Sequence, residues 1–156
     1  MKTLTPEARI FLPRLIEEMD NIVNFTKGMT LEQYRLDTRT RYAVEHAIAI
    51  ASEAAGHIKK NDPLAVTKFS EFPFKELAEQ RNFSIHKYWK VDDSIIWATA
   101  TQDIAKLQKD IRQIFSQDLK SLEGIAHKSV LEIIGNHHTS ELKTADIADA
   151  IKAVLD

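Results

Sequence analysis

Side chains suited to phosphate chemistry gather in one short segment, Arg81-Asn82-Phe83-Ser84-Ile85-His86-Lys87-Tyr88-Trp89-Lys90. His86 can act as a general base or a general acid because an unperturbed imidazole titrates near neutrality. Arg81 carries a planar guanidinium whose fork of donors matches phosphate oxygens. Asn82 can orient His86 or donate to a phosphate, and Tyr88 can donate a hydrogen bond to one. The segment is therefore a candidate active site.

Each of these residues also has an ordinary structural explanation. Arg81 can be a surface arginine, and His86 a capping or core histidine. Asn82 can brace a short helix, and Tyr88 can be a partly buried aromatic residue. The spacing becomes informative only when it is compared with a family that the same spacing defines.

The pattern Arg81-Asn82-x-x-x-His86-x-Tyr88 resembles the defining motif of the HEPN superfamily, and its flanks resemble the HepT-like branch of that superfamily. The resemblance extends over about residues 14–115. The branch usually has Gly between the motif His and Tyr, where this chain has Lys87. The flanking segments that carry the resemblance are Phe25-Thr26-Lys27-Gly28-Met29-Thr30, Asp37 to Val44, Ser52-Glu53-Ala54-Ala55, and Asp92 to Trp97 with Ile104 and Leu107.

The resemblance implies a metal-independent endoribonuclease toxin that acts on RNA as a homodimer and is encoded beside a minimal nucleotidyltransferase (MNT) antitoxin. In such cleavage the 2′-hydroxyl of the RNA attacks the neighbouring phosphate, which requires a base, an acid and a cation. The resemblance assigns catalysis to Arg81 and His86, and phosphate binding to Asn82, Lys87 and Tyr88. Tyr88 is also the residue that the antitoxin would modify with AMP, adding negative charge that repels a phosphate. No metal and no cofactor is expected.

Helix geometry bears on how this site is assembled. Asn82 and His86 share one face of an ideal helix, whereas Arg81 and His86 lie about 140° apart. One protomer therefore does not bring all the groups together unless the helix bends at His86. Two protomers related by a two-fold axis would bring two copies of each group to one cleft, which is the form that the resemblance implies.

Apolar residues recur at steps of three and four through most of the chain and predict helices. The first predicted helix starts at Pro13 and is ended by Gly28. The segment Thr30-Leu31-Glu32-Gln33 has the pattern of a capping box, which opens a further helical segment. The longest pattern runs from Asp37, a predicted cap, to Lys60. Its small residues predict the close approach of another helix, and this is the predicted reason for Gly56.

The second half of the chain continues the helical pattern. Residues 61–73 are a predicted loop, and residues 74–88 a short helix that carries the motif. A fourth helix follows Asp92 and extends to Ile114. Two more amphipathic pieces are expected in residues 118–156. The prediction is an all-α, antiparallel up-down bundle of HEPN type over residues 1–117, with a C-terminal helical extension, residues 118–156, packed on or extending the same domain.

Composition limits the class of protein. The chain has 156 residues, which suits one ordinary domain, and no Cys, which excludes disulfides, Cys-ligated metals and a thiol nucleophile. With 21 Lys and Arg against 23 Asp and Glu, the net charge is −2, so any RNA contact should be local, around Arg81, Lys87 and Lys90. The sequence has no signal-peptide pattern and no apolar run of membrane-spanning length. We expect a cytoplasmic protein.

Three further groups of polar side chains are candidate sites. Glu53 and His57 have i,i+4 spacing but lack a third metal ligand, and the pair His137-His138 suits a surface loop. Arg35, Arg39 and Arg41 form a basic stripe that is either a salt-bridged helix face or a contact for RNA phosphates.

Two further functions stay open at this point. The chain can be a non-catalytic HEPN module that binds substrate or nucleotide as the partner subunit of a nucleotidyltransferase. It can also be a helical adaptor that uses residues 118–156 as its interaction surface.

Overall fold

The computed structural model describes the backbone of residues 2–86 and 92–136 and the side chains of residues 2–80 and 92–129. Every regular element in these ranges is a helix, and they contain no strand, which confirms the all-α prediction. The chain divides into two compact units, Met1–Ser116 and Gln117–Asp156, and each is described by itself.

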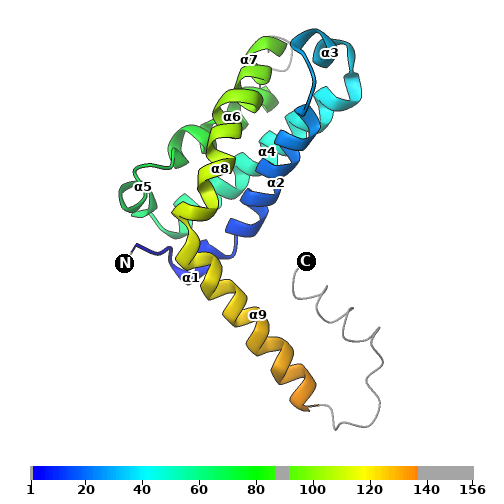
Figure 1. Ribbon diagram of the computed structural model, residues 1–156. Helices are drawn as coiled ribbons and strands as arrows, with labels where there is room; N and C mark the ends of the chain where they lie inside the picture. The colour runs from blue at the N-terminus through cyan, green and yellow to red at the C-terminus, as the bar shows by residue number, and fades with distance from the viewer. Residues whose placement is uncertain (1, 87–91, 137–156) are drawn as a thin grey trace. The chain divides into compact units, whose positions relative to one another are not determined.

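The first unit is an antiparallel bundle, as predicted. Its helical rods are α2, α4, α6 and the continuous run of α7, the π-helical segment η2 and α8, and successive rods run in opposite directions (Figure 1). The short helices α3 and α7 lie at one end of the bundle, and α1 and α5 lie at the other. The bounds are α1 Pro6–Arg9, α2 Leu12–Thr26, α3 Leu31–Leu36, α4 Thr38–Asn61, α5 Ala65–Lys68, α6 Phe74–His86, α7 Asp93–Ala98, η2 Thr99–Ile104 and α8 Ala105–Ile114.

Local signals set the ends of the first helices, as predicted. Pro13 lies in the first turn of α2, where its missing N–H is not needed. Gly28 follows α2 with a φ of 72°, a left-handed conformation that favours glycine. The side chains and backbones of Thr30 and Gln33 form the reciprocal hydrogen bonds of a capping box at the start of α3.

The long helix α4 lies in the middle of the bundle and packs against both α2 and α6. The carboxylate of Asp37 caps its start by accepting from the Thr40 N–H at 3.1 Å. A stripe of small and branched residues along α4 is buried, which confirms the predicted close packing, and comprises Val44, Ala47, Ile48, Ala51, Ala54, Ala55 and Ile58. The prediction for Gly56 is wrong, because a Cβ at this position would meet no atom of the described residues within 4 Å.

The predicted loop 61–73 contains one helical turn, α5, which the sequence pattern did not predict. This turn is tied to the N-terminal arm through Asp62, which is 2% exposed. The carboxylate of Asp62 accepts from Lys68 Nζ at 2.6 Å and from the Thr5 N–H at 3.1 Å. A buried carboxylate requires such partners, so these contacts hold the arm against the end of α4.

A cluster of four aromatic rings anchors the start of α6. The ring centroid of Phe115 lies 4.6 Å from that of Phe69, 5.4 Å from that of Phe72 and 5.8 Å from that of Phe74. All four rings are buried. Aromatic rings in tilted and edge-on contact stabilise a core beyond their buried area. The cluster joins the end of α8 to the segment that leads into α6.

The predicted fourth helix extends from Asp93 to Ile114 but is not uniform, because residues Thr99–Ile104 are π-helical. Its C-terminal part, α8, is linked to α2 through Asp20, whose carboxylate accepts hydrogen bonds from Arg112 and Gln108. Burial raises the pKa of Asp20, but the hydrogen bonds from Arg112 and Gln108 outweigh it, so the pKa lies below its ordinary value.

Beyond the bundle, α9 spans Ser116–Asn136 and includes the first of the two amphipathic pieces predicted for the C-terminal region. The second piece, with Ile147, Ile151, Val154 and Leu155, lies outside the described residues. None of the helices in the described part of the chain is long and apolar enough to span a bilayer.

Candidate active site

The motif occupies the C-terminal part of α6. Arg81, Asn82 and His86 are helical, and His86 is the last residue of α6. Lys87 and Tyr88, and with them Lys90, lie outside the described residues. Because α6 is an α-helix as far as His86, the positions of Arg81 and His86 are about 140° apart around its axis and about 7 Å apart along it. The motif arginine and histidine therefore belong to different faces of one helix.

The N-terminal half of α6 fixes the direction of the motif. Phe74 and Leu77 are buried, and α6 packs along α4. Burial of two large apolar side chains within one turn stabilises the position of the helix by about 3–6 kcal/mol in total. The site is thus built on a packed helix rather than on a loop.

The chain downstream of the motif is fixed at the start of α7. Asp92 caps α7 by accepting from the Ser94 N–H at 2.8 Å and from the Ser94 hydroxyl at 2.6 Å. These two hydrogen bonds lower the pKa of Asp92. The next residue, Asp93, forms an ion pair with Arg41 of α4 at 3.3 Å. Both boundaries of segment 87–91 are therefore attached to α4.

A partly buried polar cluster surrounds this ion pair and was not predicted from the sequence. Tyr34 of α3 is 0% exposed, its ring lies 5.2 Å from that of Trp97, and its hydroxyl has no hydrogen-bond partner among the described residues. Burial, together with the carboxylates of Glu45 and Asp93, raises the pKa of Tyr34. Burial and Asp93 also raise the pKa of Glu45. The i,i+4 spacing of Arg41 and Glu45 was the only sequence signal for the cluster.

Comparison with known proteins identifies the family. A family model described as "Ribonuclease HepT-like" matches residues 15–114, a range that includes the whole motif. The chain belongs to the HepT-like ribonuclease family. This membership confirms the predicted resemblance and the predicted ribonuclease class.

Individual relatives cover most of the HepT-like chain. A Methanocaldococcus jannaschii protein named "Putative RNase MJ1216" is 35% identical over 118 residues, covering 76% of this chain and 92% of the relative. A second protein of that organism, "Putative RNase MJ0125", is 34% identical and covers 75% of this chain and 95% of the relative. A Thermococcus cleftensis protein named "Probable ribonuclease HepT" is 32% identical over 63% of this chain and 86% of its own length. No solved structure matches the chain.

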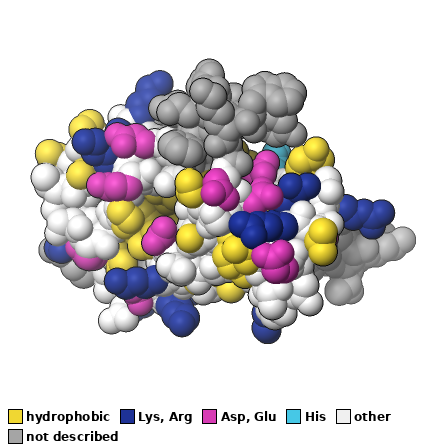
Figure 2. Space-filling view, turned by 90° about the horizontal axis from the view of Figure 1, so that it is seen from above, with side chains coloured by type: hydrophobic (Ala, Val, Ile, Leu, Met, Phe, Trp, Pro, Cys, Tyr) yellow, Lys and Arg dark blue, Asp and Glu magenta, His cyan; other side chains and the backbone are white. Residues whose placement is uncertain are grey.

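In the HepT-like bundle, the basic stripe of α3 and α4 is mostly engaged in ion pairs. Arg35 lies 2.9 Å from Glu32, and Arg41 is paired with Asp93. Arg39 is exposed. Among the described side chains on the face shown in Figure 2, acidic and basic residues are interspersed. The salt-bridged face is thus the better description of this stripe.

The side chains of Glu53 and His57 on α4 contact each other. Glu53 Oε1 lies 3.7 Å from His57 Nε2, and the His57 ring stacks on Phe11 with centroids 4.7 Å apart. The described part of the chain contains no group of three or more side chains arranged to bind a metal ion. The pair His137-His138 lies outside it.

Proposed function

We propose that this HepT-like protein is a metal-independent endoribonuclease that uses Arg81 and His86 at a site shared by two protomers. The observation that carries the proposal is the family match, which spans residues 15–114 and so includes the complete motif. The position of the motif at the end of a packed helix supports it, since a preorganised site needs rigid support.

The reaction forms one bond and breaks another at phosphorus. The 2′-oxygen of a ribose bonds to the adjacent phosphorus, and the bond from phosphorus to the 5′-oxygen breaks, which leaves a 2′,3′-cyclic phosphate and a 5′-hydroxyl. A base removes the 2′-hydroxyl proton, and an acid protonates the departing 5′-oxygen. His86 serves these steps, and Arg81 stabilises the dianionic phosphorane. In a homodimer, the two copies of His86 divide the acid and base roles.

The decisive experiment compares variants on structured cellular RNA in the presence of EDTA. We expect His86→Ala and Arg81→Ala to lower the cleavage rate by roughly 10²- to 10⁴-fold, the usual range for removing an acid–base or electrostatic group. The matched control is His127→Ala, which removes an exposed histidine of α9. Cleavage by His86→Ala at the wild-type rate would refute the assignment. Cleavage that stops in EDTA and returns with a metal would refute metal independence.

A mixing experiment tests the shared site. A heterodimer of one wild-type and one His86→Ala protomer contains a single His86, so its shared site lacks either the acid or the base. We expect the cleavage rate of this heterodimer to fall well below half of the wild-type rate. A heterodimer that keeps half of the wild-type rate, with its composition verified by mass spectrometry, would mean that each protomer acts by itself.

We further propose that the protein is the toxin of a toxin–antitoxin pair with an MNT-type nucleotidyltransferase that attaches AMP to Tyr88. The hydroxyl of Tyr88 would attack the α-phosphate of ATP and release pyrophosphate. Incubation with such an enzyme and ATP should add one AMP to the wild type and none to Tyr88→Phe, whereas Tyr42→Phe is the matched control on an exposed tyrosine. Expression without the nucleotidyltransferase should arrest growth, and Tyr88→Phe should escape neutralisation.

The balanced charge supports a second candidate, a non-catalytic HEPN subunit that binds nucleotide or substrate for a nucleotidyltransferase. The net charge is −2, and two of the three stripe arginines are held in ion pairs. This candidate predicts a stable complex with the nucleotidyltransferase and no RNA turnover at any protein concentration. The EDTA cleavage assay therefore separates the two functions.

A further inference from the structure

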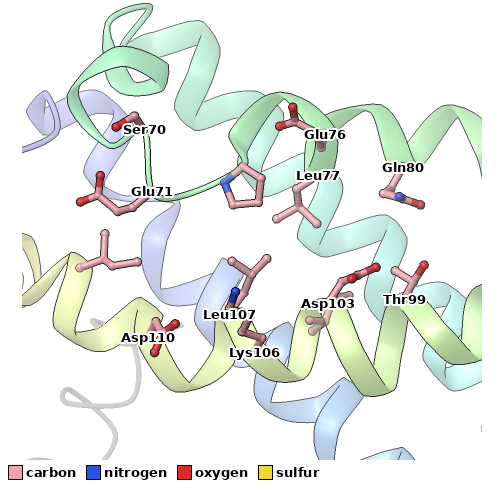
Figure 3. A pocket seen from close by; sticks show the side chains of 13 residues that line it. Ser70, Glu71, Glu76, Leu77, Gln80, Thr99, Asp103, Lys106, Leu107 and Asp110 are labelled. Atoms are coloured by element: carbon pink, nitrogen blue, oxygen red, sulfur yellow. The ribbon is translucent and has the colours of Figure 1, made fainter.

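A groove lies between the N-terminal half of α6 and the run of η2 and α8. Its volume is about 420 Å³, and it extends from Ser70 and Glu71 to Thr99. Helix α6 packs on α4, whereas η2 and α8 pack on α2, so no other helix of the described part of the chain packs extensively on the faces that line the groove. Figure 3 shows Leu77 of α6 and Leu107 of α8 pointing toward each other across it.

The spacing of the lining residues suits a helical ligand. The wall formed by η2 and α8 contributes residues at steps of three and four, namely Thr99, Asp103, Leu107, Asp110 and Ile114. These positions span about 20 Å along the helix axis, which is the length of about four helical turns. On the opposite wall, residues 73, 76, 77 and 80 repeat the same steps. Two parallel ridges of this kind form the seat into which a third helix packs.

The floor of the groove is apolar. Leu77 and Ile104 are 4% and 1% exposed, while Leu107 and Ile114 are half-buried and accessible from the groove. Pro73 adds to this floor. A ligand helix would therefore gain hydrophobic free energy by burying a stripe of apolar side chains here.

The rim of the groove is acidic. The described lining residues include four carboxylates and one cation, Lys106, which gives them a net charge of −3. Glu71 lies 3.5 Å from Lys2, but Glu76, Asp103 and Asp110 form no ion pair within the described part of the chain. Figure 3 shows that both walls contribute, with Glu76 on α6 and Asp103 and Asp110 on the other side. Carboxylates on both sides of an apolar floor complement a helix with one apolar and one basic face.

We propose that this groove docks a cationic amphipathic helix of a partner protein. A helix bound in this groove would lie next to the motif, because the lining residue Gln80 directly precedes Arg81. The groove occupies the first half of α6 and the motif occupies the second half. The proposal does not require RNA cleavage and stands apart from the function proposed above.

The charge of the C-terminal region argues against this region as the ligand of the groove. Residues 137–156 contain four acidic and two basic residues, a net of −2, and residues 116–136 contain three acidic and two basic residues, a net of −1. Both segments have the sign of charge that the rim repels. The C-terminal region, of this chain or of a second copy, is therefore disfavoured, and we assign the groove to a helix of a different protein.

The test uses the full-length protein and a fluorescein-labelled, 18-residue helical peptide as the probe. The peptide carries leucines at positions 2, 6, 9, 13 and 16, a helical spacing matched to the groove, with lysines on the flanking positions. Its control replaces every lysine by glutamate. We expect saturable 1:1 binding of the lysine peptide by fluorescence anisotropy, weakening with added salt, and none of the glutamate peptide. The absence of saturation below ~1 mM would overturn the proposal.

Two variants locate the binding. Asp103→Lys and Asp110→Lys change exposed residues of the rim and should weaken peptide binding by at least roughly tenfold each. The matched control, Glu79→Lys, makes the same change of charge at an exposed α6 residue outside the groove and should have little effect. Circular dichroism verifies that each variant is folded. Equal weakening by Glu79→Lys would show that the peptide responds only to net charge, and would overturn the assignment to the groove.

Sedimentation tests the competing occupants. We expect the rim variants to leave the oligomeric state of the free protein unchanged. If Asp103→Lys dissociates an oligomer of the free protein, a second copy occupies the groove. If removing residues 137–156 raises the affinity for the peptide at least roughly tenfold, the C-terminal region occupies it. Either result would overturn the proposal.

Discussion

Arg41 in the first turns of α4 and Asp93 at the first position of α7 form an ion pair at 3.3 Å across 52 residues of sequence. Arg41 also donates to the Thr38 hydroxyl at 3.3 Å. The two side chains are 29% and 27% exposed, so solvent screens the pair less than it screens a surface ion pair. The pair fixes the start of α7, which follows the motif by only a few residues.

Removal of this ion pair should affect both stability and cleavage. We expect Asp93→Asn to lower the free energy of unfolding by about 1 kcal/mol, and to lower kcat with little change in KM, because the chain after the motif loses an attachment. Urea denaturation and steady-state kinetics measure the two effects. The control Glu32→Gln breaks the exposed Arg35–Glu32 pair and should cost less than about 0.5 kcal/mol. Additive costs of Arg41→Met and Asp93→Asn in the double variant would mean that the two residues do not interact.

The carboxyl group of Glu45 should lower stability at neutral pH. Its pKa is raised by burial and by Asp93, so the native state binds this proton more tightly than the unfolded state does. The stabilisation that comes from protonation is complete below the ordinary value of 4.5 and is lost as the pH rises through the native value. Glu45→Gln should therefore be more stable than wild type at pH 7, and the difference should fade below pH 4.5.

Chemical denaturation of Glu45→Gln between pH 3.5 and pH 7.5 measures this dependence, since these values bracket the ordinary pKa of about 4.5. Glu79→Gln is the control at an exposed position. A stability difference that stays constant over the whole range would contradict the electrostatic explanation.

The hydroxyl of Tyr34 should be dispensable for folding. It is buried without a hydrogen-bond partner among the described residues, a state that costs about 1–3 kcal/mol of desolvation. Tyr34→Phe keeps the ring against Trp97 and removes the unpaired group, so we expect thermal stability equal to or above that of the wild type. Tyr34→Ala is the contrasting variant and should lose about 3–5 kcal/mol. A large loss in Tyr34→Phe would reveal a partner for the hydroxyl.

Gly56 offers a stabilising substitution in the middle of α4. A Cβ at this position meets no atom within 4 Å, and alanine favours a helix over glycine by about 1 kcal/mol. We expect Gly56→Ala to raise the free energy of unfolding by about that amount without changing activity. Gly28→Ala is the matched control, and it should destabilise because φ at Gly28 is 72°. Destabilisation by Gly56→Ala would indicate that another molecule approaches this surface.

The sequence by itself determined the helices and the motif. The capping box of Thr30 and Gln33, the cap at Asp37 and the stop at Gly28 depend on hydrogen bonds between residues at most four apart, so the local order of side chains specifies them. The same holds for the apolar stripe of α4, because helical periodicity alone shows which side chains share a face. The motif was recognisable because Arg81, His86 and Tyr88 lie within eight residues.

Tertiary structure alone decided which faces meet and which remain open. The pair Arg41–Asp93 and the acidic groove between α6 and α8 join residues tens of positions apart, and no local pattern encodes such distances. The turn α5 depends on Lys68 reaching Asp62 beside the N-terminal arm, and Gly56 faces open space although small residues surround it in sequence. Helices form from local hydrogen bonds, but their mutual arrangement is set by the packing of whole side-chain surfaces, which exists only in the folded chain.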